Sequence, residues 1–214
     1  MKRILCYGDS NTWGATPGTG RRYPKDIRWT GVMASLLGEE YEVIEAGLSG
    51  RTTVFDDPYN PYLNGLEYLP QNLIQAKPID LVILSLGGND LKFVNSLESA
   101  RGLARLTEIC QHHDALPGRA PVCDGDLKIL MISPIPVDEC IYEVSPLTRF
   151  LPDAAKSSKD YAKYISHFAK AHGVDFFDAA TVAGPSKIDG LHMDPESHIA
   201  LGKALAEKVK EVLG

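Results

Sequence analysis

The sequence predicts an α/β fold, a three-layer α/β/α sandwich around a five-stranded parallel sheet. Apolar runs suited to buried strands alternate along the chain with segments of helical periodicity, and right-handed crossovers then place helices on both faces of the sheet. The run at 79–86 (IDLVILSL) is almost continuously apolar, as parallel strands covered on both faces are. Neither a repeat nor a linker interrupts the 214 residues, so we expect one domain over 1–214.

Short apolar runs bounded by turn-forming residues predict the strands. In chain order the predicted strands cover residues 3–7, 41–46, 79–86, 127–133 and 174–179. The predicted helices cover 29–38, 68–76, 96–113 and 153–173, and a last helix runs from 195 to the end. Asp194 is the expected cap of this last helix, and Pro195 fits its first turn. Its apolar face is formed by Ile199, Gly202, Ala206, Val209 and Leu213.

Three segments rich in Pro, Gly, Asn and Asp are expected to be long loops, at 50–67, 114–126 and 133–152. Loops of this length in a compact domain are usually functional or interfacial. The aromatic and proline residues between Phe55 and Pro70 expose apolar groups that a monomer would have to cover. We therefore expect a homo-oligomer.

The charge and hydrophobicity of the sequence exclude some classes of binding partner. The formal charge of −6 argues against nucleic acid or an anionic membrane as the main partner, and no apolar run has the length of a membrane-spanning helix. The first residues, MKRILCYGDS, are too short in apolar content for a signal peptide. The four cysteines show no CxxC spacing, which favours reduced thiols in a cytoplasmic protein.

Polar clusters follow four of the predicted strands, at the edge of the sheet where ligands of open parallel sheets bind. The first strand ends in GDS (8–10), the second in GLSGRTT (47–53) and the third in GGND (87–90). The segment DGLHMD (189–194) follows the fifth. Their concentration at one edge is more informative than any one cluster.

Ser10 is the candidate nucleophile, although a serine after a strand is more often a helix cap. An attacking hydroxyl needs an imidazole to take its proton, and that imidazole needs its second nitrogen held. Asp189 and His192 are three residues apart in DGLH and fit these two roles. An ordinary surface turn explains their spacing equally well.

Acyl transfer also requires hydrogen-bond donors for the oxyanion. The candidates are the backbone N–H groups of Ser10 and Gly50 and the side-chain amide of Asn89. Each such donor stabilises a transition state by roughly 3 kcal/mol. Taken alone, GGND is explained as a strand-to-loop turn.

Gly8 and Asp9 are expected to turn the chain and lift the Ser10 hydroxyl to the rim of the sheet, and Asp9 and Trp13 to line the substrate pocket. A core position explains Trp13 as well. Among competing residues, Ser49 lies in GLSGR, which is not a G-x-S-x-G elbow, and His198 lies one turn inside the last helix.

Two further polar groups are explained as solvated surface. His112, His113, Asp114 and Cys123 match no usual metal-ligand spacing, and a solvated helix end accounts for them. Arg21 and Arg22 could contact an anionic substrate, but a solvated loop is the favoured explanation.

Ser10 in GDS, Gly50, Asn89 in GGND, and Asp189 with His192 in DGLH resemble the ordered blocks of the SGNH hydrolases, the GDSL-type esterases. The stretches GDSNTWG, GLSGRTT, DDPYNPYLNGLEYLP, DLVILSLGGNDLK and DGLH resemble in particular its arylesterase/acyltransferase branch. Asn11 stands where the common pattern has leucine, a departure that we do not expect to affect the chemistry.

This resemblance implies a flavodoxin-like sheet of order 2-1-3-4-5 and no metal or organic cofactor. By matching position it implies Ser10 as nucleophile, His192 as base, Asp189 as its partner, and Ser10, Gly50 and Asn89 as the oxyanion hole. The activity implied is hydrolysis of small esters, with acyl transfer to alcohols or peroxide. Assemblies up to octamers occur in the branch, in line with a homo-oligomer.

Two alternatives stay open. One is a carbohydrate O-deacetylase, which would use the same site on another class of alcohol. The other is a non-catalytic binding module that holds a phosphate or nucleotide, which the absence of a phosphate-binding glycine motif at the first helix disfavours.

Overall fold

The computed structural model describes residues 1–118, 121–144 and 150–214. Strands and helices alternate along the chain, as the hydrophobic pattern predicts. The strands are β1 (Lys2–Gly8), β2 (Tyr41–Gly47), β3 (Leu81–Ser85), β4 (Lys128–Ser133) and β5 (Asp175–Asp178). The α-helices are α1 (Ser10–Trp13), α2 (Trp29–Leu37), α3 (Gly65–Ala76), α4 (Ser96–Gln111), α5 (Ile141–Val144), α6 (Ala154–Ser158), α7 (Tyr161–His172) and α8 (Pro195–Leu213). Short 3₁₀ turns are η1 (Gly88–Lys92), η2 (His113–Ala115) and η3 (Ala179–Thr181).

The strands form one parallel sheet in the order β2-β1-β3-β4-β5, which confirms the predicted fold class and strand order. Each observed strand lies within two residues of its predicted bounds. Gly8 at the end of β1 pairs with Gly47 of β2 and with Ser85 of β3. Because these three strands end level, the polar segments that follow them leave the sheet at the same edge.

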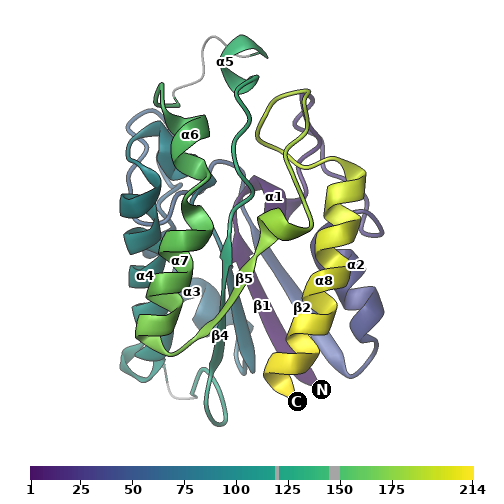
Figure 1. The fold of residues 1–214 in the computed structure, drawn as a ribbon. Helices are drawn as coiled ribbons and strands as arrows, with labels where there is room; N and C mark the ends of the chain where they lie inside the picture. The colour runs from purple at the N-terminus through teal and green to yellow at the C-terminus, as the bar shows by residue number, and fades with distance from the viewer. Residues whose placement is uncertain (119–120, 145–149) are drawn as a thin grey trace.

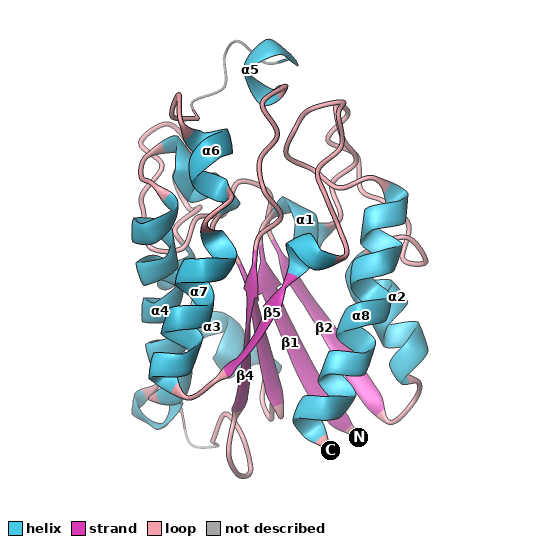
Figure 2. Cartoon of the chain, in the orientation of Figure 1, coloured by secondary structure: helices cyan, strands magenta, loops and turns pink. Residues whose placement is uncertain are grey.

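Helices cover both faces of the sheet, α3, α4 and α7 on one side and α2 and α8 on the other (Figure 1, Figure 2). Side chains alternate between the two faces, as the strand period of two requires. In β1, Leu5 and Tyr7 pack under α3 and α4, whereas Ile4 and Cys6 pack under α2 and α8. The strands are therefore buried on both faces, and this is why the run at 79–86 lacks polar alternation.

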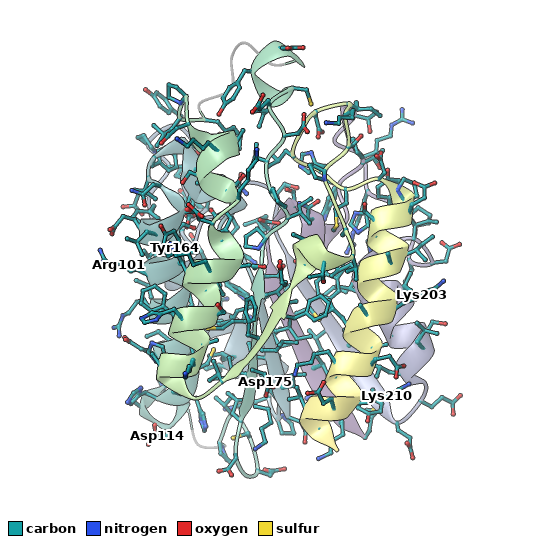
Figure 3. All side chains as sticks on the ribbon, viewed as in Figure 1. Arg101, Asp114, Tyr164, Asp175, Lys203 and Lys210 are labelled. Atoms are coloured by element: carbon teal, nitrogen blue, oxygen red, sulfur yellow. The ribbon has the colours of Figure 1, made fainter. Side chains whose placement is uncertain are left out.

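Charged side chains lie on the outside of the helical layers. Arg101 on α4 and Lys203 on α8 are exposed on opposite flanks of the molecule (Figure 3). Within the described ranges, no helix is both long enough and apolar enough to cross a membrane.

The structure corrects three details of the predicted helices. The helix predicted at 68–76 begins at Gly65, because the Asn64 side chain accepts a hydrogen bond from the Leu66 N–H (3.0 Å) and caps it there. Asp194 precedes α8, but within the described part of the chain its side chain makes no capping hydrogen bond.

The helix predicted over 153–173 is two helices, α6 and α7. The hydroxyl of Ser157 accepts a hydrogen bond from the Ser96 N–H, and that of Ser158 accepts one from the Val137 N–H (both 2.9 Å). These contacts tie the end of α6 to α4 and to the segment after β4. Helical periodicity does not reveal them.

Short helical turns occupy part of the predicted loops. In the loop predicted at 133–152, α5 forms over Ile141–Val144, and η2 overlaps the start of the loop predicted at 114–126. Residues 145–149 of the first and 119–120 of the second lie outside the described residues.

Candidate active site

Ser10 begins α1 directly after β1, at the carboxyl end of the sheet (Figure 1). The turn requires glycine at position 8, since a Cβ there would lie 1.9 Å from the Thr12 hydroxyl oxygen and 2.8 Å from the Ser85 carbonyl oxygen. The Asp9 carboxylate caps α1 by accepting the Asn11 N–H (3.0 Å). Because Asp9 is the cap, the Ser10 hydroxyl has no capping role.

The structure brings Ser10, His192 and Asp189 together in one hydrogen-bonded chain. Ser10 Oγ lies 3.0 Å from His192 Nε2, and His192 Nδ1 lies 2.8 Å from Asp189 Oδ2. An ionised carboxylate only accepts hydrogen bonds, so the proton of the neutral ring is on Nδ1 and Nε2 is left as the acceptor. This arrangement can take a proton from the Ser10 hydroxyl as the oxygen attacks a carbonyl carbon.

Asp189 is held in the charged form. Partial burial alone would raise the pKa of Asp189, but hydrogen bonds from the ring and the N–H of His192 and from the Gly18 N–H outweigh it. The pKa of this carboxyl therefore lies well below its usual range. The backbone bonds measure 2.9 Å from His192 and 3.0 Å from Gly18. They also fix the carboxylate against the imidazole.

The DGLH turn depends on Gly190, which has a φ of +71°. A Cβ at this position would lie 2.8 Å from the Ile141 N and 3.0 Å from the Asp138 O. The Asp138 N–H donates to the Gly190 carbonyl (2.8 Å), so the turn is packed on the segment that follows β4. The base is thus supported by the loop predicted at 133–152.

Asn89 lies in η1 after β3 and is almost fully buried, at 4% exposure. Its amide nitrogen donates to the Arg51 carbonyl (3.2 Å), and its amide oxygen accepts from Lys92 Nζ (2.9 Å). These two partners determine which end of the amide is the donor. The amide nitrogen carries a second hydrogen, and its donation to an oxyanion stays a prediction.

Gly50 lies in the turn after β2 with a φ of +84°. The next residue, Arg51, fastens this turn to β1. Its guanidinium donates to the Gly8 carbonyl (2.9 Å) and to the Ala46 carbonyl, and it lies over the Tyr7 ring with 4.2 Å to the centroid. The Gly50 turn is therefore held beside the end of β1, two residues from Ser10.

Asp90 connects the segment after Gly50 to the turn that carries Asn89 through hydrogen bonds. Its buried carboxylate accepts the N–H (2.8 Å) and the hydroxyl (2.6 Å) of Thr53 and the hydroxyl of Ser99 on α4 (2.8 Å). Burial raises the pKa of Asp90 to about 7, although these three hydrogen bonds favour its charged form. Asp90 thus joins the two candidate donor segments, and it is not among the described residues that line the cavity beside Ser10.

A cavity of about 30 Å³ lies beside Ser10, with room for about two water-sized groups. Asp9 lines this cavity, although its role in a substrate pocket stays a prediction, and burial raises the pKa of Asp9 to about 6. Trp13 is not among the described residues that line it; its carbonyl accepts from Arg22 Nε (2.7 Å), and the Arg22 guanidinium covers its ring. A pocket role for Trp13 stays a prediction. The lining residues are Asp9, Ser10, Asn11, Trp29, Ser85, Gly88, Asn89, Ser133, Pro134, Ile135, Ala179, Leu191, Met193 and Leu201.

The competing histidine and serine lie elsewhere. His198 is fully buried in α8, where its ring accepts the Trp29 N–H (3.4 Å) and packs edge-on against Tyr23. Ser49 is exposed in the turn after β2.

The remaining polar groups are accounted for locally. His113 Nε2 lies 3.3 Å from the Cys123 thiol, and within the described ranges no cluster of His, Cys, Asp and Glu could hold a metal ion. Arg22 pairs with Glu45 (3.0 Å), and Arg21 is exposed.

Asn11, Arg51, Asp90 and Lys92 received no role from the sequence. The Asn11 side chain reaches the backbone on both sides of His192, to the Leu191 carbonyl (3.3 Å) and the Met193 N–H (3.1 Å). Its place directly after Ser10 was the one available signal. Nothing in the sequence shows that a side chain at position 11 meets residues about 180 positions away.

The chain is similar to a known protein family and to several solved structures. The profile of the GDSL-like lipase/acylhydrolase family matches residues 6–199. The structure of the native M. smegmatis aryl esterase is 37% identical, with all of both chains covered and a TM-score of 0.88. A carbohydrate acetylesterase family member from Sinorhizobium meliloti is 33% identical over all of both chains, with a TM-score of 0.91. Est24, a carbohydrate acetylesterase from the same organism, is 34% identical over 99% of each chain, with a TM-score of 0.87. A comparison with curated proteins finds no match.

The raised pKa of Asp90 predicts a pH-dependent stability. The unfolded carboxyl loses its proton near pH 4, whereas the folded one keeps it to about pH 7, so the folded state binds the proton more tightly and stability falls as pH rises between these values. Asp90→Asn removes this term. Relative to wild type, its free energy of unfolding should therefore improve from pH 5 to pH 8, by roughly 1 to 3 kcal/mol.

Denaturant unfolding at several pH values measures this difference. Asp114, exposed in η2 (Figure 3), provides the matched control Asp114→Asn. A difference between Asp90→Asn and wild type that stays constant from pH 5 to pH 8 would contradict the prediction.

Proposed function

The chain belongs to the GDSL-like lipase/acylhydrolase family and is a carboxylic ester hydrolase, and from this premise we propose that Ser10, His192 and Asp189 cleave small esters of short acyl groups through an acyl-enzyme. The observation that carries the proposal is the continuous hydrogen-bonded chain from Ser10 Oγ through the imidazole to Asp189. Membership of an acylhydrolase family argues against a non-catalytic binding module.

In the first half-reaction, Ser10 Oγ attacks the ester carbonyl carbon while its proton passes to His192 Nε2. The carbonyl electrons move to the oxygen, which becomes an oxyanion facing the proposed donors Ser10 N–H, Gly50 N–H and the Asn89 amide. The carbon–oxygen bond to the alcohol then breaks, and the alcohol leaves with the proton from His192. Asp189 stays ionised and stabilises the imidazolium between these steps.

In the second half-reaction, a water molecule attacks the acyl carbon and gives one proton to His192 Nε2. The bond to Ser10 Oγ breaks, the serine recovers that proton, and the carboxylic acid leaves. An alcohol in place of water would give a new ester, so the same site supports acyl transfer. The proposed acyltransferase activity depends on how far water is excluded from the 30 Å³ cavity beside Ser10.

The size of that cavity supports a short acyl group. Bulky side chains border it, with Trp29 from α2, Leu201 from α8 and Ile135 from the segment after β4. An acetyl or propionyl group adds little volume beyond the carbonyl, whereas a longer chain held inside this cavity would require these residues to move. Overpacking of this kind costs about 1–3 kcal/mol.

A second candidate substrate class is the acetylated sugar. Two similar structures are of carbohydrate acetylesterases, and they cover 100% and 99% of this chain. The acyl group would be the same, and only the leaving alcohol would differ. Hydrolysis rates measured side by side on p-nitrophenyl acetate and on acetylated sugars compare an aryl and a sugar leaving group directly.

We also propose a homo-oligomer in a reducing, cytoplasmic compartment. Tyr59 and Tyr62 in the loop before α3 are about three-quarters exposed, which supports an interface there. All four cysteines are free in the structure, which supports the compartment.

Ser10→Ala should abolish ester hydrolysis, because no oxygen is left to form the acyl-enzyme. We expect kcat on p-nitrophenyl acetate to fall by roughly 10³-fold or more, with the thermal unfolding midpoint little changed. A fluorophosphonate should label wild type but not the variant. Ser49→Ala is the matched control, since Ser49 is exposed and should be dispensable for both readouts. Retained hydrolysis or labelling in Ser10→Ala would refute the proposed nucleophile.

The acyl-chain preference is tested with p-nitrophenyl esters from acetate to decanoate, which keep the leaving group constant. We expect kcat/KM to be highest for acetate or propionate and to fall at least about tenfold by hexanoate, because the cavity beside Ser10 is small and the added methylenes would press on its bulky lining residues. Equal rates across the series would show that the acyl chain does not enter this cavity.

A further inference from the structure

Asn11 follows the proposed nucleophile and bridges the residue proposed as the base. Its amide nitrogen donates to the Leu191 carbonyl (3.3 Å), and its amide oxygen accepts from the Met193 N–H (3.1 Å). Leu191 and Met193 are the immediate neighbours of His192 in the chain. One side chain on α1 therefore holds the backbone on both sides of the imidazole.

Only an amide satisfies both partners. A backbone carbonyl can only accept and a backbone N–H can only donate, so the two contacts fix the orientation of the Asn11 amide. A carboxylate of the same shape would place an acceptor against the Leu191 carbonyl. A leucine would leave both backbone groups without this partner in a half-buried position, where each lost bond has a cost.

Other hydrogen bonds shape the His192 segment from within, and the bond from the Asp138 N–H to the Gly190 carbonyl fastens it to the segment after β4. Asp189 accepts the ring and the N–H of His192, and the Ser186 N–H donates to the His192 carbonyl (2.7 Å). These bonds join residues of one turn. The turn is placed against the start of the chain by the bond from the Gly18 N–H to Asp189 and by the two bonds of Asn11.

The backbone that carries Asn11 is itself held by hydrogen bonds. The Asn11 N–H is bound by the Asp9 carboxylate, and the Trp13 N–H donates to the Asp9 carbonyl (2.9 Å). The backbone that carries Ser10 is thus one short capped helical turn. A shift of the His192 segment relative to this turn changes the distance between Ser10 Oγ and His192 Nε2 directly.

We propose that Asn11 is a positioning residue that sets the 3.0 Å contact between Ser10 Oγ and His192 Nε2. This inference rests on the proposed function of Ser10 and His192. Asn11 acts through His192 and not on the ester. A misplacement of about 1 Å between reacting groups costs on the order of 10²-fold in rate, which bounds the expected effect.

The test is Asn11→Leu, assayed on p-nitrophenyl acetate. We expect kcat to fall roughly 10- to 100-fold while KM changes by less than about threefold, because positioning of the base affects the chemical step. Asn72→Leu is the matched control, since Asn72 is a half-buried helical residue on α3 whose amide donates to the Tyr68 carbonyl (2.8 Å). It should leave kcat unchanged. A kcat for Asn11→Leu equal to that of the control would overturn the inference.

A double-mutant cycle with His192→Ala separates positioning from other effects. If Asn11 acts through the imidazole, Asn11→Leu should lower kcat in the wild-type background but have no further effect on the residual rate of His192→Ala. An equal loss in both backgrounds would mean that Asn11 contacts the ester or supports the fold generally, and the inference would fail.

Asn11→Asp provides a second variant of the same shape, should Asn11→Leu not fold. It keeps the acceptor for the Met193 N–H but loses the donor to the Leu191 carbonyl, so kcat should again fall, and wild-type kcat would overturn the inference. Ser10→Ala distinguishes a failure of the proposed function from a failure of the role proposed for Asn11. If Ser10→Ala retains hydrolysis, the proposed function is wrong, whereas an inactive Ser10→Ala beside normal Asn11 variants refutes only the role of Asn11.

Discussion

The parallel register of β1 with its two neighbours is the constraint on which the candidate site depends. Gly8 pairs with Gly47 on one side and with Ser85 on the other, so three polar segments leave the sheet at the same level. Because β1 lies between β2 and β3, Ser10 follows a strand whose two neighbours lead into the turn of Gly50 and that of Asn89. His192 reaches the same point from the other end of the chain, 182 residues away. A slip of β1 by one residue would move Ser10 off this edge and reverse the faces of its apolar side chains.

Buried ionisable side chains support the turns that carry the proposed oxyanion donors. Arg51 and Asp90 are both buried, and each joins backbone or hydroxyl groups from different segments, Arg51 at the end of β1 and Asp90 between Thr53 and α4. Burial lowers the pKa of Arg51 and raises that of Asp90, so charge in both positions is costly. What these buried groups contribute is a fixed geometry of the turns. Loops without regular secondary structure are held by hydrogen bonds of fixed direction, which apolar packing cannot supply.

The sequence contained most of the fold, because the information for it is local. Each strand is a short apolar run, and burial on both faces makes such a run easy to distinguish from an amphipathic helix. The predicted strand order came from the family resemblance and not from the pattern itself. The predictions failed where a side chain from another segment decides the outcome, as at the break between α6 and α7, where Ser157 and Ser158 bond to Ser96 and Val137. The residues of the candidate site also fall into predictable and unpredictable groups. Ser10, Asn89, Asp189 and His192 stand in recognisable motifs, whereas the contacts of Asn11 and Arg51 depend on backbone atoms of other segments.

Residues 9–11 show how one short segment separates three roles. Asp9 caps α1 with its carboxylate, Asn11 binds the backbone around His192, and the Ser10 hydroxyl is left with the imidazole as its partner. If Ser10 capped the helix, its hydroxyl would be turned toward an N–H group and away from Nε2. The aspartate before the serine therefore determines the direction of the hydroxyl, and the asparagine after it determines where the imidazole lies. Because the same three residues line the cavity, the groups that orient the hydroxyl also bound the space beside it. The Asp9 carboxyl is one of these groups, and burial raises its pKa to about 6 because the charged form is poorly solvated there. The segment that directs the hydroxyl thus also places an ionisable group at the edge of this space.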